Sequence, residues 1–169
     1  MICIGIDPGL KGAIGALVDG YPSVYDMPVL NSHIQVRAFV GIIDDIRAGW
    51  GRDKEIMVYI EKQQAMPGQG LSSTFKNGAN YGSLLTALTL LNVAFDDIPP
   101  QTWKKAMGLT KEKELSREKA LQLFPLCAHD LQRKKDEGRA EALLLAEYCR
   151  RKMAAFGMQV APQEQEIGL

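Results

Sequence analysis

Acidic side chains stand at the ends of apolar segments, and they are the residues best suited to chemistry. Asp7 follows the apolar run Ile2–Ile6, and Glu61 follows the apolar run Ile56–Ile60. If the two runs are neighbouring strands, the carboxylates lie about one strand spacing apart, roughly 5 Å. Acids that close repel one another unless a proton or a cation such as Mg²⁺ or Mn²⁺ lies between them. The alternative is that Asp7 only makes a turn with Pro8-Gly9 and that Glu61 is a solvated strand end.

A third acidic group precedes the last apolar segment of the chain. Glu137 and Glu141 are four residues apart, so they share one face of a helix. Glu141 is followed by an apolar run, and we expect it to point toward the sheet. Asp136 fits two roles, because it can cap this helix or bind a metal ion. A metal between the carboxylates would remove their mutual repulsion.

Basic residues, which phosphate binding requires, lie close to the third acidic group. Residues 101–152 hold 13 Lys and Arg against 8 Asp and Glu, in a chain of zero net charge. Such a segment indicates a phosphate-bearing partner, whereas the alternative is ordinary helix-surface charge. The basic residues that we consider for nucleic-acid contact are Lys76, Lys104, Lys105, Lys111, Lys113, Arg117, Lys134, Lys135 and Arg139.

The elements that must position these side chains follow from the hydrophobic pattern. Three apolar runs at residues 2–6, 13–18 and 21–27 are joined by tight turns and predict antiparallel strands. Further strands are predicted at 55–60 and 93–98, and helices at about 34–46, 102–107, 114–124 and 136–153. A helix to about Leu91 is expected to be capped by Ser72 or Ser73. This order predicts an α/β fold: a mixed five-stranded sheet, three antiparallel strands and then parallel ones, with helices on both faces.

Length and composition restrict the class of protein. The 169 residues are 46% hydrophobic, which suits one domain at 1–155 followed by a polar tail at 156–169. Three cysteines without a CxxC pair argue against a zinc ribbon or disulfide scaffold and fit a reducing cytosol. The first residues lack a basic signal region, and the longest apolar stretch, 84–95, is too short to span a bilayer. We therefore expect a cytoplasmic protein without a membrane segment.

Three segments resemble the motifs of RuvC-type Holliday-junction resolvases, the crossover junction endodeoxyribonucleases. They are IGIDPG at residues 4–9, IEKQ at 60–63 and AEALLLA at 140–146, and their order and spacing match over roughly residues 1–152. Residues 66–70 and 138–143 look most like the phage or prophage branch. The resemblance implies a ribonuclease-H-like fold and a homodimer. It also implies nicking of four-way DNA junctions with 5′-phosphate ends, two Mg²⁺ ions with Mn²⁺ as a substitute, and a bacterial cytosol or phage-infected host cell.

The resemblance also assigns roles to particular residues. By motif position, Asp7, Glu61 and Glu141 are metal ligands, although the family usually has Asp at the last position. The family's fourth ligand lies three residues earlier, where this chain has Gly138. Asp136 or Glu137 must then substitute, or the fourth ligand is missing. Lys104 and Lys113 resemble basic residues near the scissile phosphate, and Lys113 is expected to offset the phosphate charge.

Two surfaces and two alternative functions complete the expectations. The family carries an aromatic wedge after the second motif; here Met66 is an apolar wedge or a gap-filler under the loop. The helix ending near Leu91 is expected to form the dimer interface, unless its apolar residues (Leu84, Leu85, Leu88 and Leu91) all pack on the sheet. The alternative functions are junction binding with weak or lost catalysis, and cleavage of other branched DNA. No nucleotide cofactor is expected, because ATPases of similar fold need a second domain.

Overall fold

A mixed five-stranded sheet forms the centre of the protein in this computed structural model. The structure describes residues 1–51, 53–65, 67–110 and 113–158, and for Lys113 it describes the backbone only. The strands are β1 (Ile2–Asp7), β2 (Ala13–Val18), β3 (Tyr21–Asp26), β6 (Ile56–Glu61) and β7 (Ala94–Ile98). Their order across the sheet is β3-β2-β1-β6-β7. β2 runs antiparallel to β1 and β3, whereas β6 runs parallel to β1 and to β7. The predicted α/β sheet is confirmed.

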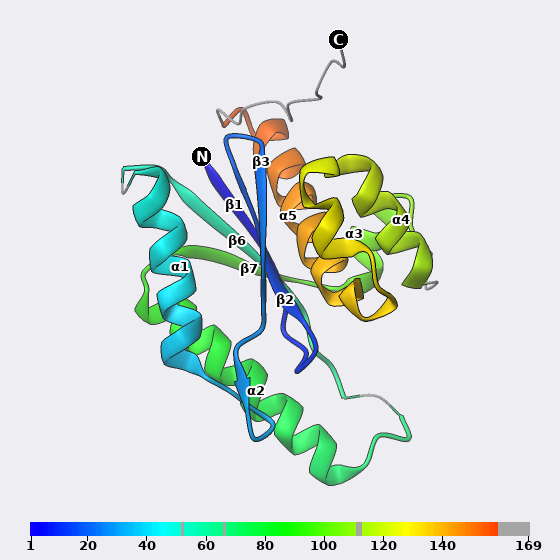
Figure 1. The fold of residues 1–169 in the computed structure, drawn as a ribbon. Helices are drawn as coiled ribbons and strands as arrows, with labels where there is room; N and C mark the ends of the chain where they lie inside the picture. Colours follow the sequence, from blue (N-terminus) through cyan, green and yellow to red (C-terminus); the bar gives the residue numbers. More distant parts are fainter. Residues whose placement is uncertain (52, 66, 111–112, 159–169) are drawn as a thin grey trace.

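Helices cover both faces of this sheet, as predicted. α1 (Val36–Trp50) and α2 (Leu71–Leu90) lie on one side, and α3 (Pro100–Ala106), α4 (Lys113–Leu123) and α5 (Glu137–Ala155) lie on the other (Figure 1). The sequence pattern did not predict the short hairpin β4 (Val29–Leu30) and β5 (His33–Ile34). It also missed the 3-10 helices η1 (Pro125–Leu131) and η2 (Lys134–Asp136). No helix in the described ranges is long and apolar enough to cross a bilayer.

The alternation of side chains along β1 divides the core into two layers. Ile2, Ile4 and Ile6 are fully buried against α1 and α2, while Cys3 faces the cluster formed with α3, α4 and α5. A strand buried on both faces reads as a continuous apolar run. β1 therefore runs through the middle of the core and ends at Asp7. Its parallel neighbour β6 ends beside it at Glu61, since Ile6 pairs with Ile60. The predicted juxtaposition of these two strand ends is confirmed.

The backbone of α5 rests directly on the sheet. A Cβ on Gly5 of β1 would overlap the carbonyl oxygen of Ala142, and a Cβ on Gly15 of β2 would lie 2.6 Å from the amide nitrogen of Leu143. Real Cβ atoms do not come that close to backbone, so only glycine allows this approach. The contact fixes how far α5 stands from the sheet, and with it the depth of Glu141 beside β1.

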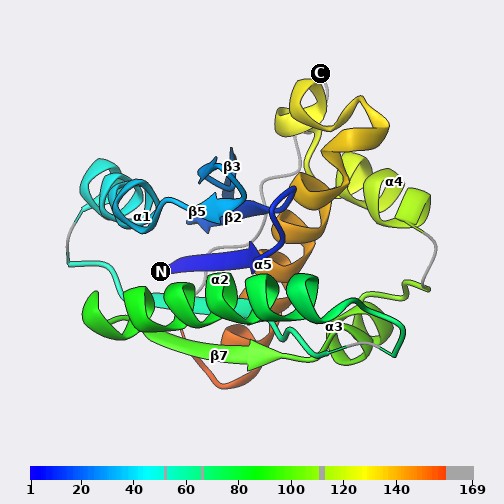
Figure 2. The same ribbon diagram turned by 90° about the horizontal axis from the view of Figure 1, so that it is seen from below.

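Helix α2 differs from its prediction in two respects. It begins at Leu71 after Gly70, and no side chain caps it, so the predicted serine cap is wrong. Its apolar residues Leu84 and Leu88 are fully buried in this chain's own core, against which Leu85 and Leu91 also pack. Those four leucines therefore give no surplus face for a dimer. The large apolar side chains that α2 exposes are Leu71, Phe75 and Leu90, and Figure 2, the view from below, shows this helix lengthwise.

Candidate active site

Four carboxylates meet in one pocket at the carboxyl ends of β1 and β6. Asp7 and Glu61 come from these strands, and Glu137 and Glu141 come from the first two turns of α5. The pocket has a volume of about 580 Å³. Its remaining wall comes from α3 and the segment after it: Pro100, Gln101, Lys104, Lys105, Leu109 and Thr110. The acids predicted from three separate motifs are thus brought together.

Asp7 is held by the turn that follows β1. The backbone N–H of Gly9 donates a hydrogen bond of 3.1 Å to Asp7 Oδ1, which fixes the carboxylate at the pocket floor. Burial raises the pKa of Asp7 to about 6, and the charges of Glu141 and Glu137 add to that shift. A carboxyl group in this environment favours a proton or a cation.

Glu61 lines the same pocket from the end of β6 and is bound by a buried tryptophan. The indole Nε1 of Trp103, on α3, donates to Glu61 Oε2 at 2.9 Å, and Trp103 itself is fully buried. Burial raises the pKa of Glu61 to about 7, and the charges of Asp7 and Glu141 act in the same direction. The hydrogen bond from Trp103 opposes that shift without cancelling it.

Glu141 binds two side chains that come from other helices. Its side chain belongs to a residue that is only 9% exposed. Glu141 Oε1 accepts from the ammonium of Lys104 at 2.5 Å and from the hydroxyl of Ser116, on α4, at 3.2 Å. Lys104 is thus the cation that balances this acid.

Glu137 and Asp136 are adjacent in sequence but face different parts of the molecule. Glu137 lines the acidic pocket, whereas Asp136 lies in a separate hollow beside Leu10, Met27 and Arg139. Asp136 is buried, and its carboxylate accepts from the backbone N–H of Arg133 at 2.8 Å and from the guanidinium of the same residue. The structure therefore separates Asp136 from the other acids, because one residue turns the chain by about 100° at the start of a helix.

Gly138 is required where it stands. A Cβ at this position would lie 2.5 Å from the carbonyl oxygen of Lys11 and 3.1 Å from Asp7 Oδ2. The turn after β1 therefore occupies the space in which a side chain at 138 would reach the acids. The missing ligand-type residue follows from this close approach of two backbones.

A basic hollow adjoins the acidic pocket. It shares Asp7, Glu137 and Glu141 with the pocket and is otherwise lined by Gly9, Lys11, Gly12, Lys134, Lys135 and Gly138. Lys11, Lys134 and Lys135 are exposed. The last two were predicted from the charge pattern, whereas Lys11 was missed, because a single lysine in a turn gives no sequence signal.

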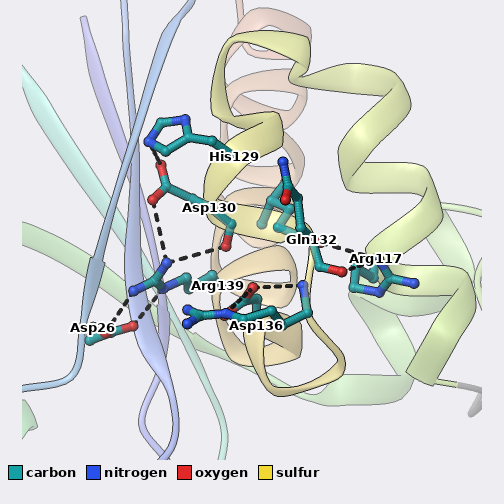
Figure 3. Close-up of polar contacts among 9 residues, drawn as sticks. Asp26, Arg117, His129, Asp130, Gln132, Asp136 and Arg139 are labelled. Atoms are coloured by element: carbon teal, nitrogen blue, oxygen red, sulfur yellow. Dashed lines mark hydrogen bonds and ion pairs between the residues drawn. The ribbon is translucent and has the colours of Figure 1, made fainter.

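Two arginines predicted to contact DNA are engaged elsewhere (Figure 3). Arg139 bridges Asp26 at the end of β3, with N–O distances of 2.6 and 2.7 Å, and Asp130 in η1. Arg117 donates to the carbonyl oxygens of Leu131 and Gln132. It also pairs with Glu114 of its own helix. Because both guanidinium groups bind protein partners, they hold the segment that contains η1 and η2 against the sheet and α4.

The remaining predicted positions divide into three cases. Lys104 and Lys105 line the acidic pocket. Lys76 is exposed on α2 and lines neither the acidic pocket nor the basic hollow. Met66, Lys111 and the side chain of Lys113 lie outside the described residues. Trp103 and Ser116 were missed, because a buried tryptophan and a serine within a helix read from sequence as packing and surface.

The donor set fits a divalent metal ion of the hard, oxygen-preferring kind. Four carboxylates line one pocket, and the raised pKa values of Asp7 and Glu61 express burial together with repulsion by neighbouring acids. Among the described residues, however, no three His, Cys, Asp or Glu side chains lie close enough together to hold a metal ion. Lys104 and Trp103 instead hold Glu141 and Glu61 at separate places.

Comparison with known proteins gives a consistent picture of the fold. No family model matches the chain. Over 100 residues, 58% of this chain, it is 34% identical to the chloroplastic Holliday junction resolvase MOC1 of Chlamydomonas reinhardtii; the match spans only 11% of that protein. A Thermus thermophilus RuvC in complex with a Holliday junction substrate aligns with a TM-score of 0.59 at 20% identity, covering 93% of this chain and 97% of that one.

A second RuvC structure from Thermus thermophilus aligns with the same TM-score and identity over 94% of this chain and 98% of that one. The fold is therefore that of RuvC, a ribonuclease-H-like fold, and the predicted resemblance is confirmed at this level. The assignment to a phage or prophage branch remains a prediction.

Proposed function

We propose that this chain is a metal-dependent, structure-selective endonuclease that nicks four-way DNA junctions. The observation that carries the proposal is the convergence of Asp7, Glu61, Glu137 and Glu141 in one pocket at the edge of a RuvC-like sheet. The sequence similarity to a resolvase and the fold shared with a protein solved on a junction substrate support the same substrate class. Fold alone would not be enough, because one fold hosts many activities.

The four carboxylates are the proposed ligands of Mg²⁺, with two ions as the expected number and Mn²⁺ able to substitute. The charges of Glu141 and Glu137 act on Asp7, and the charges of Asp7 and Glu141 act on Glu61, so the acids lie close enough to share bound cations. Glu137 replaces the ligand that Gly138 lacks, since it lines the pocket and Asp136 does not. Bound metal would supply an activated water and stabilise the leaving oxygen of a phosphodiester.

The basic side chains of the pocket have a role that follows from their charge. Lys104 and Lys105 line the pocket from α3, where they can face a phosphate that enters it. Lys104 now pairs with Glu141, and an ammonium in that place stabilises negative charge at the reacting phosphate when it is released from the acid. Lys113, at the start of α4, remains a further candidate for this role.

A strand of DNA can continue from the pocket into the basic hollow. Lys11, Lys134 and Lys135 surround that hollow and share its border with the acids. Phosphate contacts of this kind position nucleic acid without reading its sequence. The DNA-binding residues that we propose therefore include Lys11 and no longer include Arg117 and Arg139.

A homodimer remains part of the proposal, because a junction has near-twofold symmetry and two sites are needed for paired nicks. Its support is now the exposed set Leu71, Phe75 and Leu90 on α2 rather than the buried leucines. Sedimentation that shows only monomer at micromolar concentration would exclude paired nicking. The free and buried Cys3, Cys127 and Cys149 agree with work in a reducing compartment such as a cytosol.

The deciding experiment is cleavage of a labelled four-way junction beside linear duplex, with Mg²⁺, with Mn²⁺ and with EDTA. The proposal expects symmetric nicks with 5′-phosphate ends on the junction only when metal is present. Tight binding without cleavage under either metal would favour a junction-binding protein with lost catalysis. Equal cleavage of other branched DNA would widen the substrate, and equal cleavage of linear duplex would contradict structure selectivity.

A further inference from the structure

Helix α3 connects the two walls of the acidic pocket through adjacent residues. Trp103 donates to Glu61 Oε2, on β6, at 2.9 Å, and Lys104 donates to Glu141 Oε1, on α5, at 2.5 Å. The helix reaches this place because β7 runs parallel to β6, with Ile98 paired to Glu61, and Pro99 and Pro100 then start α3 at once. The chain therefore turns back over Glu61 within five residues.

The contact between Trp103 and Glu61 is buried and directional. Trp103 is fully buried, packed in the cluster of α3, α4 and α5, so its ring has no room to rotate. A buried indole N–H needs an acceptor, and Glu61 is the acceptor found for it. The bond engages Oε2 of Glu61 and leaves Oε1 as the oxygen that it does not use.

Asp7 and Glu61 therefore achieve the same end by different means. The carboxylate of Asp7 is oriented by backbone, through the N–H of Gly9. Glu61 has a longer side chain with one more rotatable bond, so its carboxylate needs a partner outside its own strand. Side chains that hydrogen-bond a metal ligand from behind set its orientation, and their loss typically costs about 10–100-fold in metal affinity or activity.

We propose that Trp103 is a positioning residue whose indole N–H fixes the Glu61 carboxylate in the orientation that binds a divalent cation. The inference rests on the proposed metal-dependent function and adds a residue that none of the acidic motifs contains. Trp103 touches neither the reacting phosphate nor the metal, and it acts only through Glu61.

The test compares Trp103→Phe with Phe124→Leu in the full-length chain, using Mn²⁺ alone as the calorimetric probe. Trp103→Phe keeps an aromatic ring but removes the N–H donor, and we expect Mn²⁺ affinity to fall by about 10–100-fold. Phe124 is buried in the same cluster and does not line the acidic pocket, so Phe124→Leu should lower the melting temperature and leave Mn²⁺ affinity unchanged. Unchanged affinity in Trp103→Phe would overturn the inference.

A fluorescence measurement avoids any problem of folding in the Trp103 variant. The chain has two tryptophans, and Trp50 lies at the end of α1, outside the residues that line the pocket. In Trp50→Phe, the remaining emission comes from Trp103, and Mg²⁺ should change its intensity or wavelength. The change should disappear in the Trp50→Phe, Glu61→Gln double variant. If the intensity and wavelength of the emission do not change while calorimetry detects Mg²⁺ binding, the inference is contradicted.

Failure of the proposed function gives a different result. If the unaltered chain binds no Mn²⁺, or if Asp7→Asn binds it as well as the unaltered chain, the acidic pocket is not a metal site. If binding is normal in the unaltered chain, lost in Asp7→Asn and unchanged in Trp103→Phe, only the role of Trp103 is wrong. At saturating Mn²⁺, cleavage by Trp103→Phe should approach the normal rate, because affinity rather than chemistry is impaired.

Discussion

Two acidic clusters lie side by side near the start of α5, and they are built in opposite ways. In the pocket, Asp7 and Glu61 are buried beside other acids, and their pKa values are raised to about 6 and about 7. In the neighbouring hollow, hydrogen bonds from Arg139 and Arg133 lower the pKa values of Asp26 and Asp136. The first cluster concentrates negative charge, and the second neutralises it.

The difference separates function from support. A carboxylate that is paired with arginine stabilises the fold and has little capacity left for a ligand. A carboxylate buried beside like charges destabilises the folded chain at neutral pH, by about 1.4 kcal/mol for each unit of raised pKa. Such an arrangement is common where a protein binds a cation or transfers a proton. Predictions that exchange the properties of the two clusters test this contrast.

The largest effect is expected from Asp7→Asn. The variant keeps an acceptor for the Gly9 N–H but removes one charge from the pocket. Loss of several kcal/mol of metal-dependent stabilisation of the transition state corresponds to a decrease in the rate of junction cleavage of about a thousandfold or more. The melting temperature in EDTA should rise, since a source of repulsion is gone. Asp45→Asn, at an exposed position of α1, is the matched control and should change neither quantity.

The next effect distinguishes the adjacent acids Glu137 and Asp136. Glu137→Gln should weaken Mn²⁺ binding by about 10-fold or more, at least the loss seen for an outer-shell partner, with little change in melting temperature. Asp136→Asn should do the reverse, lowering the melting temperature because the guanidinium of Arg133 loses its charged partner. Calorimetry and thermal unfolding of the two variants check this. Weakened Mn²⁺ binding in Asp136→Asn alone would make Asp136 the fourth ligand.

A smaller effect is expected at Gly138, which lies between the two clusters. A methyl group at this position meets the carbonyl oxygen of Lys11, and the overlap should cost about 1–3 kcal/mol of unfolding free energy. Gly138→Asp would restore the residue type that the resolvase motif carries, yet it should bind Mn²⁺ more weakly by displacing the turn after β1. Denaturant unfolding and calorimetry measure both changes. A Gly138→Asp variant with tighter Mn²⁺ binding would contradict this account.

The last prediction concerns the pH dependence of stability without metal. Asp7 and Glu61 bind protons more tightly in the folded chain, so their contribution is present below about pH 4 and is lost as pH rises through about 6 and 7. Asp26 and Asp136 act with the opposite sign, stabilising above about pH 4 and losing that contribution as pH falls. In EDTA, the melting temperature should fall between pH 5 and 7.5, at about 2–4 °C per kcal/mol. Asp7→Asn should flatten this slope, and an equal slope would contradict the assignment.

The sequence predicted those parts of the site that depend on regular local pattern. Apolar runs that end in Asp7 and Glu61 place both acids at strand ends, and β1 and β6 do lie side by side in parallel. The helical spacing of Glu137 and Glu141 likewise brings both to the pocket. These features depend on residues within one element or on the order of adjacent elements.

The other parts depend on contacts between distant segments, which a single sequence does not reveal. Arg139 looked like a DNA-binding residue because its partner Asp26 lies 113 positions earlier. Asp136 and Glu137 could not be distinguished, because their directions depend on the residue at which α5 begins. Gly138 read as a missing ligand, whereas the backbone of Lys11 leaves space for nothing larger.

The backbone contacts of α5 also limit how this sequence can vary. At Gly5, Gly15 and Gly138, even the smallest side chain meets main-chain atoms that have no rotamer to escape into. In a saturation mutagenesis library, we expect these three positions to reject alanine and serine as firmly as they reject tryptophan. Tolerance there should depend on the presence of a Cβ and be nearly independent of side-chain size, unlike the graded response of the leucines that surround them. A protein lineage in which α5 packs this closely on the sheet can change its acids one at a time, but it can replace these glycines only if the helix moves.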